Sequence, residues 1–256
     1  MPVSLRLTRL AGLPVVDNAV FSSRQLLDTG RSSHKWDRTS VTQGLEDSYL
    51  WLVSNAEQPA QAKVSHVLDT LSRWKALRWK GGGRTTIEAP FTAWVGRNCR
   101  LIDSLQRKRL AELSPQDLQT ILYLAGSAFE QGWPPTMIGK SLHFLLPHCV
   151  VLWDLEYVRD AYGLGCDVYS FVGYQNFGRR ILRYLADKEG RTVLSSLSRE
   201  HVEDAGFPCP LPKLIDEIAY SPDSAANRRL RANILQSIGA AGPPFAVAEY
   251  LFDACQ

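Results

Sequence analysis

Residues 134–163 read PPTMIGKSLHFLLPHCVVLWDLEYVRDAYG, and the rest of the chain is organised around this stretch. Its two opening prolines predict a turn, because the proline ring fixes φ and removes a donor N–H. Gly139 permits a close approach of the backbone, and Lys140 follows it at the start of an apolar run with helical spacing. Pro147 ends this run. The first half of the stretch therefore predicts a helix, a hairpin, a lysine and a second helix.

The second half of the stretch predicts an aspartate at the start of a further helix. Residues 149–153, Cys-Val-Val-Leu-Trp, are rich in β-forming side chains and predict a short extended segment. Asp154 follows directly, where a carboxylate caps the free N–H groups of a helix. We therefore expect Lys140 and Asp154 to share one cleft. The alternative is an ordinary surface ion pair.

This layout resembles the helix-hairpin-helix DNA glycosylase superfamily. The family pattern is a hairpin of the type L-P-G-V-G-x-K, a helix, then V-P-V-D-x-H-V and a helix that ends near L-G. Here P-P-T-M-I-G-K, V-V-L-W-D-L-E-Y-V and A-Y-G occupy the corresponding positions. The resemblance places Lys140 on the family's Schiff-base lysine and Asp154 on its catalytic aspartate. Thr136 and Ile138 replace two hairpin glycines, and Glu156 replaces the histidine.

The resemblance implies an all-α fold in which two helical subdomains flank an active-site cleft. By this analogy residues 1–256 form a single glycosylase-like unit. Residues 60–154 form its hairpin-bearing subdomain, and residues 1–59 together with 155–256 form the partner subdomain.

The implied activity is the removal of a modified base from double-stranded DNA. A glycosylase flips the base out of the stack, and a carboxylate close to C1′ stabilises the positive charge that develops on the sugar. Asp154 has this role in the implied mechanism. Lys140 is the nucleophile whose Schiff base permits strand cleavage, with phosphate binding as the alternative.

Further site residues are predicted from their positions beside the motif and from a basic stretch around residues 81–83. No acid lies between Arg73 and Arg84, and Trp74 and Trp79 alternate with the cations, which suits phosphates and exposed bases. The alternative is a solvated helix end with buried tryptophans. The predicted DNA contacts are Arg78, Lys80, Arg84, Thr136 and Gly139. The predicted pocket residues are Trp133, Phe144, Trp153 and His143, for which a purely structural role is the alternative.

Composition sets limits on the class of protein. Of the 256 residues, 45% are hydrophobic and 21% charged, which is an ordinary globular balance. No apolar run approaches the ~20 residues of a membrane span, and no signal-peptide core is present. Five cysteines include no C-x-x-C pair, and those beyond Asp154 are too widely spaced for the iron–sulfur cluster of some family members. We expect a cytoplasmic monomer without metal or cofactor and without a membrane partner.

The apolar periodicity predicts helices along most of the chain. Residues 49–53 predict either a strand or a buried piece of helix, and residues 191–212 predict one short helix and a proline-rich loop. Ser114-Pro115-Gln116-Asp117 is a strong helix start. The expected helices span residues 60–78, 97–110, 115–131, 169–186, 212–220, 224–238 and 243–254.

The identity of the base follows only from the resemblance. The block G-K-S-L-H-F-L-L-P-x-x-V-V-L-W-D is most similar to compact bacterial glycosylase-like proteins, some of which excise glucosylated hydroxymethylcytosine from phage DNA. An oxoguanine glycosylase with lyase activity in base excision repair is the competing hypothesis. A non-catalytic helix-hairpin-helix DNA-binding protein and a helical interaction protein are the alternatives from other classes.

Overall fold

The computed structural model describes residues 24–25, 46–74, 76–77, 83–154, 164–205 and 210–220. These residues are helical and contain no strand, so the predicted all-α class is confirmed for this part of the chain. None of the described helices is long and apolar enough to cross a membrane. The elements are α3 (Glu46–Ser54), α4 (Ala60–Arg73), α5 (Arg84–Leu105), η1 (Leu110–Glu112), α6 (Pro115–Phe129), α7 (Pro135–Leu145), α9 (Val168–Glu189), α10 (Arg191–Ala205) and α11 (Leu211–Tyr220).

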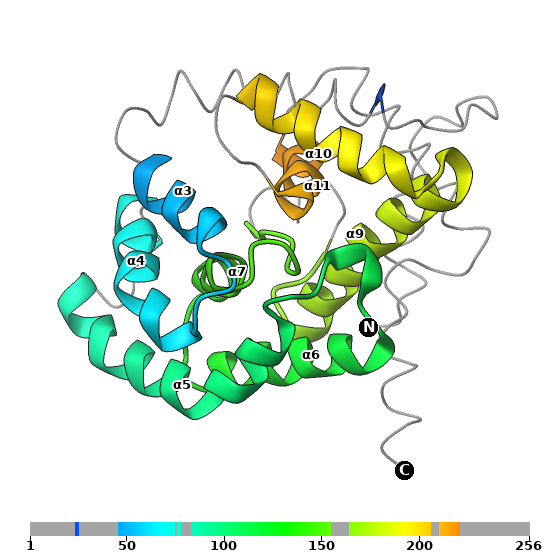
Figure 1. Ribbon diagram of the computed structural model, residues 1–256. Coiled ribbons are helices and arrows are strands. Elements are labelled where there is room, and N and C mark those ends of the chain that lie inside the picture. Colours follow the sequence, from blue (N-terminus) through cyan, green and yellow to red (C-terminus); the bar gives the residue numbers. More distant parts are fainter. Residues whose placement is uncertain are drawn as a thin grey trace, which may run out of the picture.

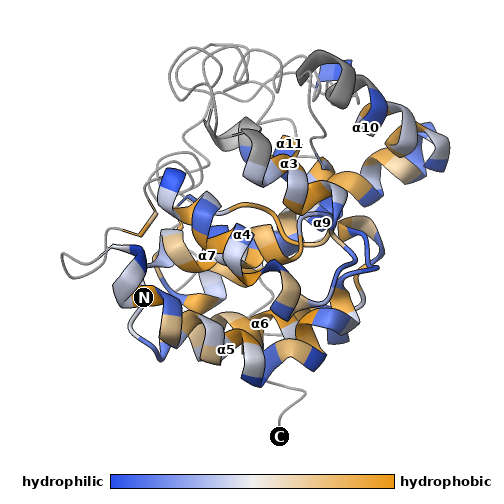
Figure 2. Cartoon of the chain, turned by 60° about the vertical axis from the view of Figure 1, so that its left-hand side comes forward, coloured by the Kyte–Doolittle hydropathy of each residue, from blue (hydrophilic) through white to orange (hydrophobic). Residues whose placement is uncertain are grey.

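Helix α7 is the central element of the fold, and α3, α4 and α6 pack against it (Figure 1). Every residue from Met137 to Leu145 is buried, including Lys140 and His143. A helix that is buried on all sides must be covered by other elements, which explains why its sequence is apolar on more than one face. Figure 2 shows apolar residues where α5, α6 and α7 face one another and polar residues on the outer faces of α5 and α6.

The predicted start of α6 agrees with the structure. Ser114 Oγ accepts a hydrogen bond from the Asp117 backbone N–H at 3.1 Å. The backbone N–H of Ser114 donates in return to Asp117 Oδ2 at 2.8 Å. This reciprocal capping box, with Pro115 at the first helical position, fixes where the helix begins.

Several predicted boundaries were wrong. Helix α5 begins at Arg84 and not at residue 97, and it continues through Pro90. Its buried residues recur at helical spacing on both sides of the proline, so burial of this face outweighs the hydrogen bond that Pro90 lacks. Helix α4 ends at Arg73. Residues 49–53 are helical, and residues 191–205 form one long helix, not a short one.

The hairpin also lies earlier than predicted. Helix α7 already begins at Pro135, so most of P-P-T-M-I-G-K is helical. The turn lies before it and contains Gly132 at φ 72°, a left-handed conformation that favours glycine. The helix expected after Asp154 and the helices expected at 224–238 and 243–254 lie outside the described residues.

The predicted extended segment 149–153 is only partly present. Cys149 and Val150 instead form a turn that bonds the Leu146 carbonyl, and residues 151–154 belong to no helix or strand. A side chain, and not a strand, pairs with the backbone of this segment. The amide of Gln175 on α9 accepts a hydrogen bond from the Val151 N–H at 2.6 Å and donates one to the Val151 carbonyl at 3.1 Å. Gln175 is fully buried. Its amide supplies the donor and acceptor that a neighbouring strand would otherwise provide, so the buried backbone is satisfied without a sheet.

Gly139 brings α7 into direct contact with the same segment. A Cβ added at Gly139 would lie 2.6 Å from the Trp153 carbonyl oxygen and 2.7 Å from the Trp153 Cβ. Real Cβ atoms do not approach a backbone so closely, so only glycine permits this packing. The close approach predicted at Gly139 is therefore an internal contact between α7 and the chain that leads to Asp154.

Buried polar side chains bond the backbone carbonyl of Val150 and the last carbonyl of α7. The His143 Nδ1 lies 2.7 Å from the Val150 carbonyl oxygen, which can only accept, so Nδ1 carries the proton. Nε2 then accepts from the Tyr49 hydroxyl at 2.7 Å. At the C-terminus of α7, Lys63 donates to the carbonyls of Ala56 and Leu145. Burial lowers the pKa of Lys63 to about 8.

Replacement of Gly139 by alanine should destabilise the fold. The added methyl group overlaps backbone atoms of Trp153, which cannot rotate away, and overpacking of this kind costs about 1–3 kcal/mol. The matched control is Gly126→Ala on α6, where no atom lies within 4 Å of the added Cβ and the helix gains propensity. Urea unfolding of both variants measures the difference. Equal stability of Gly139→Ala and wild type would contradict the tight contact.

The free energy of unfolding should fall in mild acid. Burial lowers the pKa of His143 to about 3 and that of His148 to about 4, against 6.5 for an ordinary histidine. Between about pH 6.5 and 4 the unfolded chain therefore binds more protons, and stability is lost as the pH falls through this window. Each histidine adds a slope of up to about 1.4 kcal/mol per pH unit.

Urea unfolding at several pH values across this window measures that slope. His143→Gln removes one of the two titrating groups, so it should be less stable than wild type but lose about half of the slope. An unchanged slope in that variant would show that other groups cause the acid sensitivity.

Candidate active site

Lys140 and Asp154 form an ion pair at the centre of the fold. Lys140 Nζ lies 2.9 Å from Asp154 Oδ2, and the two side chains are only 11% and 15% exposed. The ion pair between Arg107 and Glu57 shows the contrast, since its side chains are 86% and 61% exposed. The alternative of an ordinary surface ion pair therefore does not describe Lys140 and Asp154.

The local structure explains why these two side chains meet. Lys140 directly follows Gly139 on α7, and Asp154 directly follows Trp153 at the end of the segment 151–154. Gly139 packs on the Trp153 backbone, so each charged residue is the next residue in the chain after this contact. The amine therefore comes from the helix and the carboxylate from the segment that packs on it.

Trp74 is the aromatic side chain next to the pair. It caps the C-terminus of α4, and Lys140 Nζ lies 5.8 Å from the centre of a Trp74 ring. The ring packs edge-on against Phe144 at 5.2 Å and tilted against Tyr49 at 5.5 Å. The sequence placed Trp74 in a basic, aromatic stretch suited to nucleic acid, with a buried tryptophan as the alternative. Its contact with Lys140 was not predicted, because nothing local indicates which side chain it meets.

A second ion pair reaches the same ring. Lys213 Nζ lies 2.9 Å from Asp216 Oδ2 and 6.0 Å from the centre of a Trp74 ring. Both residues are on α11, in the largely apolar sequence LPKLIDEIAY, which also contains Glu217. Sequence analysis missed them. Two opposite charges three residues apart in an apolar helix are the signal that could have found them.

Buried donors without a partner accompany the pair. Trp74 Nε1, Ser141 Oγ and Trp153 Nε1 are buried and have no hydrogen-bond partner in the part of the chain that the structure describes. Ser141 and Trp153 are the chain neighbours of Lys140 and Asp154. Buried polar groups are nearly always hydrogen-bonded, so these three donors are exceptions among the described residues.

The four predicted pocket residues are core side chains in this structure. Trp133 packs against Phe91 and Trp94 on α5. Trp153 is fully buried against Phe171, and Phe144 is fully buried beside Tyr49 and Trp74. His143 is fully buried, and both of its ring nitrogens bond inside the protein. The apolar surface of these four side chains is used in packing. They therefore have the structural role that was the alternative to lining a substrate pocket.

Of the predicted DNA contacts, Arg84, Thr136 and Gly139 lie among the described residues, and their surroundings differ. Arg84 begins α5 and pairs with Asp69 and, at 3.5 Å, with Glu88. Thr136 lies half-buried in the first turn of α7. Gly139 is buried against Trp153, a position that faces the protein and not the solvent. Arg78 and Lys80 lie outside the described residues.

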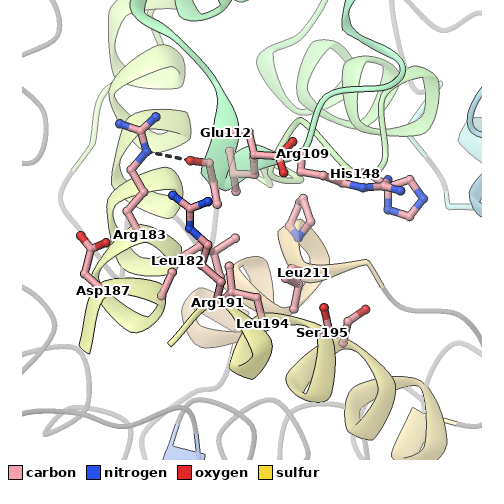
Figure 3. A pocket seen from close by; sticks show the side chains of 15 residues that line it. Arg109, Glu112, His148, Leu182, Arg183, Asp187, Arg191, Leu194, Ser195 and Leu211 are labelled. Atoms are coloured by element: carbon pink, nitrogen blue, oxygen red, sulfur yellow. Dashed lines mark hydrogen bonds between the residues drawn. The ribbon is translucent and has the colours of Figure 1, made fainter. Parts of the chain in front are cut away.

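A cavity of about 900 Å³ with both apolar and polar lining residues lies between η1, α9, α10 and the start of α11 (Figure 3). Neither Lys140 nor Asp154 lines it. Arg183, on its wall, donates from Nε to the Ala111 carbonyl at 2.7 Å, which ties α9 to η1. The polar residues that line the cavity are Arg109, Glu112, His148, Arg183, Asp187, Arg191, Ser195 and Ser198.

Within the described ranges, no three histidine, cysteine, aspartate or glutamate side chains are grouped so that they could hold a metal ion. The candidate site provides an amine, a carboxylate and an aromatic ring near the amine.

Comparison of the chain with protein-family models, with curated proteins and with solved structures finds no match.

Proposed function

We propose that this protein is a DNA glycosylase that flips a modified base out of double-stranded DNA and excises it, with Asp154 and Lys140 as its catalytic residues. The observation that carries the proposal is their largely buried contact at 2.9 Å. The resemblance of residues 134–163 to helix-hairpin-helix glycosylases predicted these two residues as partners before their distance was known.

Asp154 provides the negative charge for the first step. As the bond from C1′ to the base breaks, the bonding electrons leave with the base and the sugar becomes positively charged. A carboxylate that is 15% exposed stabilises this charge more than one in bulk water, because less solvent screens it. Part of the barrier to base release is thereby removed.

Lys140 provides the nucleophile for a bifunctional reaction. As the neutral amine, its nitrogen attacks C1′, and the base departs with the electron pair of the C1′–N bond. The C1′–O4′ bond of the sugar ring then opens, with its electron pair going to O4′, and the nitrogen loses its protons to give the Schiff base. Asp154 accepts a proton readily from this position, because its oxygen is already within hydrogen-bond distance of Nζ. Elimination from the Schiff base then cleaves the DNA strand.

The proposed substrate is glucosylated hydroxymethylcytosine in phage DNA, with oxoguanine as the competing base. Support for this choice is the resemblance to compact bacterial glycosylase-like proteins, and not the geometry of the site. A non-catalytic DNA-binding protein is the second candidate function. A carboxylate and an amine that are removed from solvent together favour the enzyme, since a protein that only grips phosphate needs no buried aspartate.

Asp154→Asn should abolish base release and leave DNA binding nearly unchanged, because it removes a charge and little volume. A loss of about 4 kcal/mol of transition-state stabilisation slows the step about a thousandfold. The assay incubates purified protein with glucosylated, hydroxymethylated and oxoguanine-containing duplexes and counts aldehyde-reactive abasic sites. The control Glu57→Gln removes a carboxylate from an exposed ion pair and should keep full activity.

The three duplexes separate the possible outcomes of this assay. Activity of wild type on oxoguanine alone would keep the glycosylase proposal and reject the phage-defence substrate. Salt-dependent binding to DNA without any base release would favour the non-catalytic alternative. Full activity of Asp154→Asn would remove Asp154 from the mechanism.

Borohydride should trap a covalent adduct between wild-type protein and its DNA substrate, and Lys140→Arg should form none. Arginine keeps a cation beside Asp154, so the fold loses little, but its guanidinium cannot form the Schiff base. Lys108→Gln, at a surface ion pair with Asp117, is the control and should be trapped like wild type. Base release without any trapped adduct would instead indicate a monofunctional enzyme that uses water.

A further inference from the structure

Lys213 and Asp216 form a buried ion pair that the proposed reaction does not use. Their side chains are 4% and 1% exposed, and their charged atoms are 2.9 Å apart. Removal of two charges from water costs several kcal/mol per ion, and apolar residues of similar volume often stabilise a fold equally well or better. Stability of the fold alone is therefore a weak explanation for this pair.

Trp74 connects this pair with Lys140. The ammonium groups of Lys140 and Lys213 lie 5.8 Å and 6.0 Å from the centre of a Trp74 ring. An ammonium is attracted to the face of an indole ring, and the attraction is stronger where water is excluded. Helices α4, α7 and α11, which are far apart in the sequence, thus each contribute one of the three side chains in this contact.

The indole also rests on the helix that carries Lys140. Trp74 packs edge-on against Phe144, which lies one helical turn after Lys140 on α7. Tyr49 of α3 packs against Trp74 as well. A displacement of the indole would therefore change the wall beside the Lys140 side chain.

We propose that Trp74, Lys213 and Asp216 are positioning residues for Lys140, so that α11 completes the candidate site. Asp216 holds Lys213, Lys213 attracts the indole from α11, and the indole restricts where the Lys140 ammonium lies relative to Asp154. The proposal rests on the proposed function only in that Lys140 is taken as the reacting amine. None of the three residues needs to touch the substrate.

The test measures how fast the Lys140 amine is acylated in the full-length protein without DNA, by mass spectrometry of the labelled peptides. The double variant Lys213→Met/Asp216→Asn removes both charges of this pair together, so neither is left buried without the other. Trp74→Leu removes the ring. A coupling of about 1 kcal/mol corresponds to about a fivefold change in rate, so Lys140 should be labelled at least about fivefold faster in both variants.

Two further variants separate positioning from general loosening. Trp74→Phe keeps an aromatic ring and should stay near the wild-type rate. Lys188→Gln removes a cation from a similar contact with Tyr184 on α9, at 5.7 Å, and should leave Lys140 labelling unchanged. Circular dichroism and thermal unfolding identify the variants that are folded.

Unchanged Lys140 labelling in the folded double variant and in folded Trp74→Leu would overturn the positioning role. In the base-release assay, the double variant should lower the single-turnover rate about tenfold with less than about a threefold change in the Kd for DNA. If wild type releases no base while Lys140 labelling still rises in the variants, the positioning role stands and the proposed function fails.

Discussion

The candidate site depends on one contact that only glycine permits, between Gly139 on α7 and the backbone of Trp153. The charged residues of the site are the next residues along each segment, so the separation of the two backbones sets the separation of the amine and the carboxylate. Gln175 bonds Val151 through both its donor and its acceptor, so the segment leading to Asp154 contacts α7 through Gly139 and α9 through Gln175. Precise placement of Asp154 thus comes from backbone packing and not from a strand.

Three lysines are buried in the described part of the fold, and their partners differ. Lys63 bonds two carbonyl groups, and because these carry only partial charge, burial still lowers its pKa to about 8. Lys140 and Lys213 are each paired with a carboxylate, and both lie near Trp74. The roles are therefore separate: Lys63 satisfies the last carbonyl of α7, whereas the other two place full ion pairs around one indole, an arrangement that stability alone does not favour.

Local signals in the sequence predicted the parts of the fold that local forces determine. The capping box at Ser114 and the apolar run of α7 are of this kind, and Lys140 and Asp154 were paired by a motif of fixed order. Helix α5 begins earlier than predicted and continues through Pro90, a local breaker, because burial of a continuous face decides the outcome. The contact of Trp74 with Lys213 has no local signal at all, because only tertiary packing brings residues so distant in sequence together.

Ile138, which stands where the glycosylase pattern that this stretch resembles has a glycine, has a structural role in this fold. Ile138 is fully buried, and its N–H donates to the Pro134 carbonyl at 3.0 Å, so that N–H group is already used within the first turn of α7. The glycine that remains, Gly139, packs on Trp153 inside the protein. In the family, hairpin glycines bring backbone N–H groups to a DNA phosphate; here the glycine brings the catalytic candidates together. If the protein binds DNA as proposed, its contacts with the DNA phosphates therefore depend more on surface side chains than on the hairpin. Arg84 and Thr136 are predicted contacts that remain partly exposed.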